Sequence, residues 1–404
     1  MPIHLLLVAL LAGCSCQDDP ADTGLAASDA PTWSGGTRDV VARNCATCHV
    51  EGGSAPFALQ TWEQAAPLAS ALISAVDAGT MPPWSPTDDC RDLDDPRLMS
   101  DDDTALLRAW ADGGALEGDP TDPITTTEST ISPTDHLVPP EAYTPPFDTA
   151  QDEYHCFVFD ESFEEEAWLR ASRVLPDTSQ VHHVLTYALV GDQIETMEAL
   201  DAAEDGPGYT RFGSVIPMGG DEGLSAFPTQ VAAWVPGAAP IVYPSDQAVR
   251  VPAGARIVMQ VHYSAQGGDS VPDATSIELQ LEDTPPDWVV STRPLGVFEL
   301  DIPAGESDVE HTDTYTNWSP EPVTLRGVAA HMHLLGVEIG GELQRGDGSS
   351  ECLLDIPEWD FDWQQAYTFT EPVVVASGES IDVRCSFDNS AENQPLVDGE
   401  PREP

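Results

Sequence analysis

Five consecutive residues near the start of the chain constrain its first fold more than any other feature. Cys45, Ala46, Thr47, Cys48 and His49 form the pattern Cys-x-x-Cys-His. Two thiols at this spacing can attach to the vinyl groups of a haem, and the histidine can bind one axial position of its iron. A unit that holds one haem needs only about a hundred residues. The chain has 404 residues, so at least one further domain is expected.

Helical patterns surround this motif. One helix is expected to run into it from Arg38, a second over residues 62–76, and a third after Ser100, where a capping serine precedes three acidic residues. The order of helix, haem motif, helix, loop and helix resembles a small cytochrome c. The resemblance implies an all-α domain with haem c over residues 37–118.

The loop between the second and third helices carries the second candidate ligand of the haem iron. Met81 lies there between Gly79-Thr80 and Pro82-Pro83. A thioether ligand raises the reduction potential of a haem, which suits electron transfer. Met99 is the alternative ligand, and simple core packing is the alternative role of Met81.

The first residues predict export. Residues 1–13 are largely apolar and end in small residues, which is typical of a signal peptide rather than a membrane span. The sequence Leu11-Ala12-Gly13-Cys14 resembles a bacterial lipoprotein cleavage box, which implies lipidation of Cys14. The chain would then face the periplasm or the cell exterior and reach the membrane only through this lipid anchor. An ordinary cleaved signal is the alternative, because no Lys or Arg precedes the apolar run.

The charge of the chain excludes nucleic acid as a partner. Seventy Asp and Glu residues oppose 15 basic residues, all of them arginine, and the formal net charge is −55. Such a surface repels nucleic acid and anionic lipid.

The composition predicts the remaining organisation. Residues 14–36 are small and acidic, as in a tether, and residues 119–150 are rich in Pro and Thr, as in a semi-rigid linker. From residue 151, short Val, Ile, Thr and Tyr runs alternate with polar residues, which predicts all-β sandwich domains. Pro285-Pro286 divides them into residues 151–288 and 289–404.

Three groups of histidines in the β region are candidate metal ligands. His331 and His333 would share one face of a strand and could bind one metal. His182 and His183 would point apart on a regular strand, so they can share a metal only at a strand end or a bulge. His262 is expected on the face of its strand that carries Val258 and Gln260. It could complete a set of three with His182 and His183.

The three groups occur in a recognisable order. Along the chain, His182 and His183 come first, His262 follows, and His331 and His333 come last. Trp234-Val235-Pro236-Gly237 lies between the first two groups, and Cys385-Ser386-Phe387-Asp388-Asn389 follows the last group. Over residues 151–390 this order resembles the copper type II, ascorbate-dependent monooxygenases, which include peptidylglycine α-hydroxylating and dopamine β-hydroxylating enzymes. The resemblance implies two β-sandwich (jelly-roll) domains that face each other across a solvent-filled cleft.

The resemblance also implies roles for the histidines. His182, His183 and His262 would bind a first copper that stores and delivers an electron. The catalytic pair His331 and His333 would bind a second copper, at which O2 is activated and a C–H bond is hydroxylated. We expect the haem domain to relay electrons from an external donor to the first copper.

Two features depart from the family pattern. The family's second copper takes a methionine from an Asp-Glu-Met-Cys segment after the Cys385 region, and no such segment follows here. The last domain is therefore expected to be truncated and the second copper site incomplete, with Cys385 left without that segment's cysteine. Ala329 stands where the peptide-amidating branch has an arginine, so we infer an unknown small-molecule substrate rather than a peptidylglycine.

The sequence leaves several alternatives open. A non-catalytic copper and haem electron-transfer lipoprotein is one alternative to the monooxygenase, and a surface binding module with structural histidines is another. Apart from Cys14 and the haem motif, five cysteines remain, an odd number, and their pairing cannot be deduced from sequence. Cys90 is expected to brace the haem domain or to pair with Cys16.

Overall fold

The computed structural model describes most of the chain. The predictions for the signal peptide, Cys14, Cys16 and most of the tether fall on residues 1–29, which lie outside the described residues. Among the residues that are described, no helix is long and apolar enough to cross a membrane. The described residues are 30–51, 53, 55–84, 86–87, 89–94, 98–125, 131–147, 152–217, 227–265, 269–297, 300–361, 363–394, 396–397 and 400–401.

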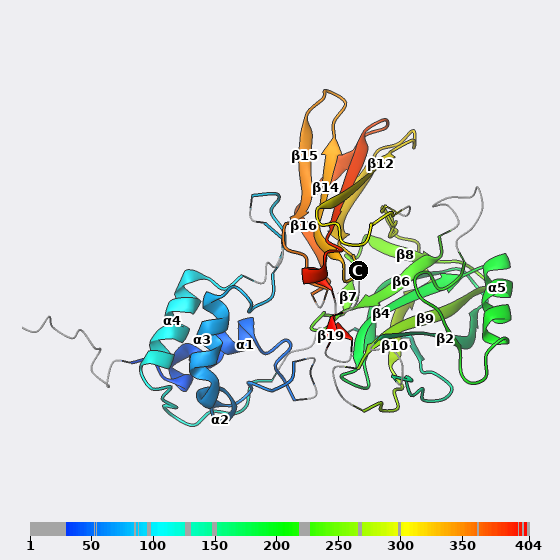
Figure 1. The fold of residues 1–404 in the computed structure, drawn as a ribbon. Coiled ribbons are helices and arrows are strands. Elements are labelled where there is room, and N and C mark those ends of the chain that lie inside the picture. Colours follow the sequence, from blue (N-terminus) through cyan, green and yellow to red (C-terminus); the bar gives the residue numbers. More distant parts are fainter. Residues whose placement is uncertain are drawn as a thin grey trace, which may run out of the picture.

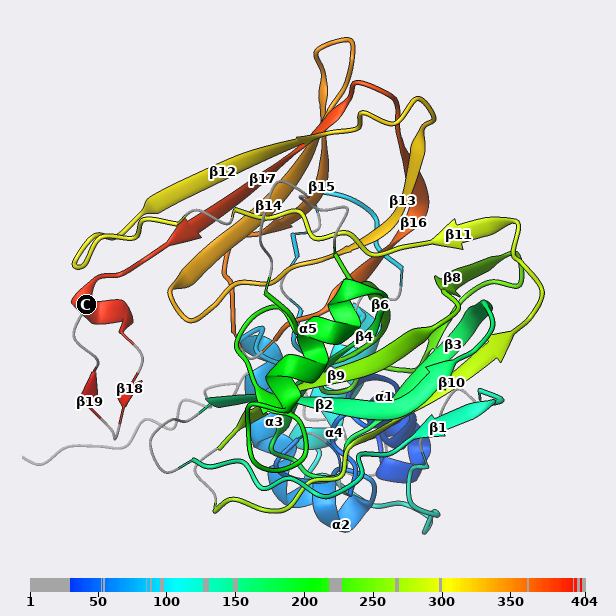
Figure 2. The same ribbon diagram turned by 90° about the vertical axis from the view of Figure 1, so that its right-hand side faces the viewer.

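The chain is mostly β-sheet, as predicted. A helical unit lies to one side of two β units, which are stacked on each other (Figures 1 and 2). The helical segments are η1 (Trp33–Thr37), α1 (Arg38–Asn44), α2 (Trp62–Ala65), η2 (Ala66–Leu68), α3 (Ala69–Asp77), α4 (Asp101–Asp112), α5 (Asp192–Asp201) and η4 (Ala391–Asn393).

The strands fall into two sandwiches and a terminal hairpin. The first β unit contains β1 (Asp135–Leu137), β2 (Asp152–Phe163), β3 (Ala167–Leu175), β4 (Val181–Leu189), β5 (Tyr209–Thr210), β6 (Thr229–Trp234), β7 (Ile241–Val242), β8 (Gln247–Val251), β9 (Ala255–Ser264), β10 (Ser276–Glu282) and β11 (Trp288–Val290). The second contains β12 (Val309–Thr316), β13 (Val323–Ala329), β14 (Gly336–Gln344), β15 (Ser350–Ile356), β16 (Ala366–Val375) and β17 (Ser380–Phe387), and β18 (Leu396–Val397) pairs with β19 (Glu400–Pro401).

The helical unit has a core of its own. Trp33 and Trp110 are buried with their ring centroids 5.9 Å apart, and Leu59 and Leu107 complete the cluster. The Ser100 side chain accepts a hydrogen bond from the Asp103 backbone N–H, the expected N-cap of α4. Because Trp33 belongs to this core, the helical unit begins before the predicted boundary at residue 37.

The first β unit packs two sheets face to face. The strand orders are β5-β2-β9-β4-β6 and β1-β10-β3-β8-β11, with β7 beside β3. Side chains from both sheets form one buried core. The helix α5, which the β-rich pattern did not predict, packs Met197 against Val258 on the outer face of the first sheet. The first unit also extends past its predicted end at residue 288, since β11 pairs with β8 through Val290.

The second β unit is smaller. Its strands form a four-stranded sheet of order β12-β17-β14-β15 and a two-stranded sheet of β13 and β16. The core between them includes Ile356 from the larger sheet and Tyr367 from the smaller one.

The prediction that residues 119–150 form a linker without a core was wrong for much of the described part. Ile124 is buried in the helical core, and Leu137 is buried in the core of the first β unit. The strand β1 pairs with β10, and Tyr143 forms an isolated bridge with Asp273. The prolines interrupt this segment but leave apolar side chains that the neighbouring units bury.

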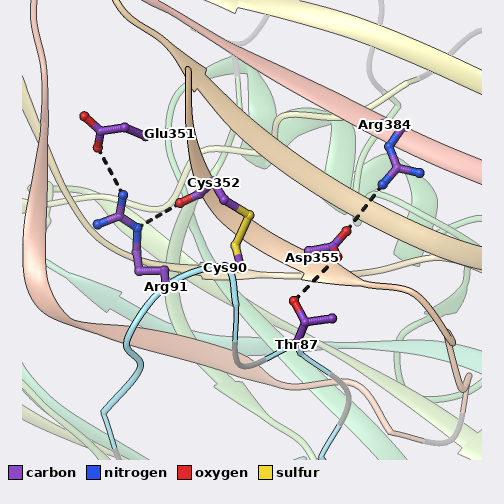
Figure 3. Close-up of a disulfide and its surroundings, with 7 residues drawn as sticks. All are labelled: Thr87, Cys90, Arg91, Glu351, Cys352, Asp355 and Arg384. Atoms are coloured by element: carbon purple, nitrogen blue, oxygen red, sulfur yellow. Dashed lines mark hydrogen bonds and ion pairs between the residues drawn. A yellow bond between two sulfur atoms is a disulfide. The ribbon is translucent and has the colours of Figure 1, made fainter. Parts of the chain in front are cut away.

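The prediction for Cys90 was also wrong. Cys90 forms a disulfide with Cys352 of β15, 262 residues away (Figure 3). The described residues from Pro83 to Asp94, which we call the strap, therefore leave the helical unit and lie against the second β unit. Sequence spacing cannot reveal such a pair, because the two cysteines come from different units.

Candidate metal centre

The first group of histidines meets at a bulge. The residue pairing between β4 and β9 shifts between Val181 and His183, so that His183 lies opposite His262 while His182 is the extra residue. Val181 and Val184 point into the sandwich core. The bulge therefore turns both neighbouring histidines to the outer face, where His262 already lies.

Three ring nitrogens converge there. The His183 Nδ1 lies 3.3 Å from the Nδ1 of His182 and 3.3 Å from the Nδ1 of His262. All three donor atoms lie within 4.8 Å of one another, and all three residues are buried. Metal–nitrogen bonds of about 2.0 Å at tetrahedral angles would hold two nitrogens about 3.3 Å apart. The spacing therefore fits one metal ion bound by three imidazoles.

Neighbouring side chains fix the orientation of His262. Its Nε2 donates to the Asp152 carboxylate over 3.0 Å, which leaves the lone pair on Nδ1, on the side of His183. Tyr154 stacks on the same ring, with centroids 4.1 Å apart and planes within 4°. The ring is thus held as a metal ligand needs to be held, in one tautomer and one orientation.

The second pair lies in a loop rather than on a strand. His331 and His333 belong to the connection between β13 and β14. Their side chains are nevertheless adjacent, with Nε2 atoms 3.3 Å apart, and Met332 between them is buried in the core. The His331 Nδ1 donates to the Gln364 side-chain oxygen over 2.6 Å, which leaves its Nε2 lone pair toward His333.

The two histidine sets lie close together. The ring centroids of His183 and His331 are 6.2 Å apart, so no wide cleft separates the sets, contrary to the expectation from the family resemblance. Two phenyl rings cross between the β units. Phe361 of the second unit stacks on His182 at 5.3 Å, and Phe212 of the first unit lies 4.9 Å from the ring of His333. Each β unit therefore supplies an aromatic contact to the other unit's histidines.

The environment lowers the pKa of four of these imidazoles and so favours their neutral form. Burial lowers the pKa of His183 well below its usual value, and the neighbouring imidazole of His262 lowers it further. Desolvation by neighbouring protein atoms also lowers the pKa of His262 and His331, against the hydrogen bonds to Asp152 and Gln364. The pKa of His333 falls to about 4, mainly by desolvation. Neutral imidazoles keep the lone pairs that a metal ion needs.

The Cys-x-x-Cys-His motif forms a turn after α1. The Cys45 and Cys48 thiols are free, and burial raises the pKa of Cys45 to about 12, with a smaller effect from nearby Cys48. The buried His49 donates from Nδ1 to the Phe57 carbonyl over 3.0 Å, which leaves the Nε2 lone pair for a ligand bond. Two free thiols and one oriented imidazole fit the attachment of a c-type haem.

The two candidate methionines differ in their packing. Met81 is partly buried in the loop after α3, where its backbone N–H bonds to the Ala75 carbonyl. Met99 packs against the helical core. Met99 therefore contributes to core packing, whereas Met81 is not part of that cluster.

Sequence reasoning missed the residues that orient the ligands. Asp152 and Gln364 lie 110 and 33 residues from the histidines that they bond. Phe361 was also missed. An acidic, amide or aromatic residue far along the chain carries no signal until the fold brings it to the site.

The comparisons with known proteins bear on the second β unit. Residues 301–403 match the model of the copper type II ascorbate-dependent monooxygenase, C-terminal domain. The match contains His331 and His333 and ends beyond the described residues. No curated protein matches the chain. The family match and the three-histidine site together support copper as a cofactor and a copper-dependent monooxygenase type of function.

Proposed function

We propose that the chain is an exported, haem-fused copper monooxygenase that hydroxylates a C–H bond of a small molecule. In the overall reaction, R–H, O2, two electrons and two protons give R–OH and water. His182, His183 and His262 would hold one copper, and His331 and His333 the other. The observation that carries the proposal is that two histidine sets from two β units meet, with one of them inside the family match.

The chain's own residues divide the work. Asp152 and Gln364 hold one histidine of each set in the tautomer that offers its lone pair to the metal. Copper, when bound, supplies one-electron redox chemistry and a binding site for O2. His331 and His333 are exposed, whereas the first set is buried, so O2 and substrate would meet at the second pair.

The haem belongs to the same proposal. Cys45 and Cys48 would hold it, with His49 and Met81 as axial ligands, and an external donor would supply electrons one at a time. Export would be directed by residues 1–13, with lipidation of Cys14.

The first test is the ratio of copper to haem iron in purified protein after dialysis with Cu(II). A ratio near two supports both copper sites. The variants His183→Ala and His331→Ala should each lower it by one, and His136→Ala, in β1, should not. A ratio near zero in the unmodified protein would overturn the copper assignment and leave a binding module.

One observation favours a second candidate, a non-catalytic copper and haem electron-transfer lipoprotein. Met332 is 4% exposed and packed in the core, so it does not join His331 and His333. In the described part of the chain, only the first set forms a group of three or more His, Cys, Asp or Glu donors that could hold a metal. Oxygen uptake in the presence of a one-electron reductant distinguishes the two candidates. Protein that binds copper but consumes no oxygen with any substrate tested would support the electron carrier.

A further inference from the structure

The strap is the feature that the proposed function leaves unused. It begins two residues after Met81 and ends before α4, so its sequence position is inside the helical unit. Its contacts lie instead on the second β unit (Figure 3). The Thr87 N–H donates to the Asp355 carbonyl over 2.9 Å, and Arg91 donates to the Cys352 carbonyl over 3.0 Å and to Glu351 over 3.1 Å.

The far end of the strap pairs with the free edge of β16. Leu93 forms an antiparallel bridge with Phe369, and the Asp94 N–H donates to the Thr368 carbonyl over 2.8 Å. The Cys90–Cys352 disulfide fixes the same segment to β15. The strap is therefore attached to both sheets of the second sandwich, and it covers backbone groups that an edge strand would expose.

The near end of the strap approaches the second histidine pair. Trp84 packs edge-on against Tyr367, with ring centroids 5.6 Å apart. It belongs to the cluster that contains Ala330 and Met332, the two neighbours of His331 in sequence. The Pro83 carbonyl accepts a long hydrogen bond of 3.5 Å from Gln365, whose neighbour Gln364 bonds His331.

We propose that the strap is the electron-entry element of the protein and that it leads to His331 and His333 rather than to the first histidine set. This inference rests on the proposed function, because it requires both haem and copper. The covalent chain runs from Met81 to Pro83 and Trp84. The Pro83 carbonyl accepts the hydrogen bond from Gln365, and the neighbouring Gln364 contacts the His331 ring. Each transfer oxidises ferrous haem to ferric haem and reduces one Cu(II) to Cu(I), with no atom or proton moved. An external one-electron reductant returns the haem to the ferrous state.

The assignment differs from the expectation drawn from the sequence. The relay was expected to end at the first copper. In the structure, the described residues of the strap contact β15, β16 and the loop before β16, all of which belong to the second unit. In the described part of the chain, the first set is linked to this side through the contact of His183 with His331 and the stacking of Phe361 on His182.

The test follows electron transfer inside the full-length protein loaded with haem and Cu(II), without oxygen. A pulse of reductant makes ferrous haem, and its reoxidation is followed optically while the Cu(II) signal is followed by electron paramagnetic resonance. Gln365→Leu, which removes the hydrogen bond to the Pro83 carbonyl, should slow the reoxidation of ferrous haem most, and Trp84→Leu, which removes the contact with Tyr367, should slow it less. Trp318→Leu is the matched control, since Trp318 belongs to the same β unit but is 83% exposed. The strap proposal fails if all three variants keep the wild-type rate.

A second readout measures position instead of rate. His183→Ala protein would carry copper only at the second pair, and pulsed resonance would give one narrow distance between ferric haem and Cu(II). The double variant Cys90→Ser/Cys352→Ser should lengthen and broaden this distance. An unchanged distance in that double variant, or fast transfer that survives in His331→Ala protein, would overturn the proposal while leaving the monooxygenase assignment intact. Protein that binds no haem or no copper would overturn the proposed function itself.

Discussion

The two histidine sets, each of which we propose to bind a copper, are built in opposite ways. The first set is buried, lies on paired strands and brings together three imidazoles. The second is exposed, lies in a loop and has two adjacent imidazoles. A carboxylate orients the first set and an amide the second. Rigid surroundings suit a metal that only changes charge, whereas an accessible pair suits a metal that must meet a substrate.

The largest effect should come from breaking the first set at its centre. His183 is the residue whose Nδ1 lies 3.3 Å from both other nitrogens. His183→Ala should therefore remove one copper per chain and abolish product formation, with the second copper retained. Elemental analysis and oxygen uptake measure both results. Retention of two coppers in this variant would contradict the three-histidine site.

The second effect tests the Cys90–Cys352 disulfide, which attaches the strap to the second β unit. The double variant Cys90→Ser/Cys352→Ser should lower the free energy of unfolding of that unit by about 2–4 kcal/mol, because the crosslink no longer restricts the unfolded chain. Calorimetry should show this as a shift of one transition, with the first β unit unaffected. Cys385→Ser is the control, since Cys385 is a free thiol in the same unit. Equal shifts in both variants would show that the strap adds no stability.

The third effect compares the two orienting groups. Asp152→Asn and Gln364→Leu should each weaken copper binding at their own set by about 10–100-fold, because the hydrogen bonds of Asp152 and Gln364 hold a ligand imidazole in place. The loss should be greater for Asp152→Asn, since a carboxylate makes the stronger hydrogen bond to an imidazole. Competition with a copper chelator measures the copper affinity. Measured in His331→Ala protein it reports on the first set, and in His183→Ala protein on the second. Loss at the opposite set would contradict the assignment.

The smallest effect concerns the phenyl rings that cross between the units. Phe361→Leu removes a stacked contact on His182, and Phe212→Leu removes a tilted contact on His333. Such ring contacts contribute about 0.5–1.5 kcal/mol. Each substitution should change the Cu(II) resonance of the opposite unit's site while both coppers stay bound. Unchanged spectra in both variants would indicate that the rings do not touch the occupied sites.

Local patterns predicted local features of this molecule. The Ser100 cap, the β-rich region after residue 151 and the shared face of Gln260 and His262 follow from spacing alone. The requirement of a strand end or a bulge at His182-His183 was also available, because neighbouring side chains on a regular strand point apart. The position of that bulge was not, since it depends on the register with β9.

Features that depend on distant partners could not be predicted. The prolines of residues 119–150 indicated a spacer, but Ile124 and Leu137 found apolar neighbours in two different cores. The α5 helix lies within a region whose pattern is otherwise β. The pairing of Cys90 with Cys352 requires knowledge of how the helical unit sits on the second sandwich. In each case the missing information is a contact between segments far apart in the chain.

The strap has a consequence for how the protein is made. Cys352 follows Cys90 by 262 residues, and at the usual speed of protein synthesis this stretch takes roughly 13–50 s to produce. Throughout that interval the Cys90 thiol and the Trp84 ring have no native partner, and Cys156 is synthesised before it ends. The helical unit can form its core early, but the strap reaches its native contacts only after β15 and β16 have been synthesised. Premature pairing of Cys90 with Cys45, Cys48 or Cys156, all of which precede Cys352 in the chain, is therefore the biosynthetic error that the order of the chain favours.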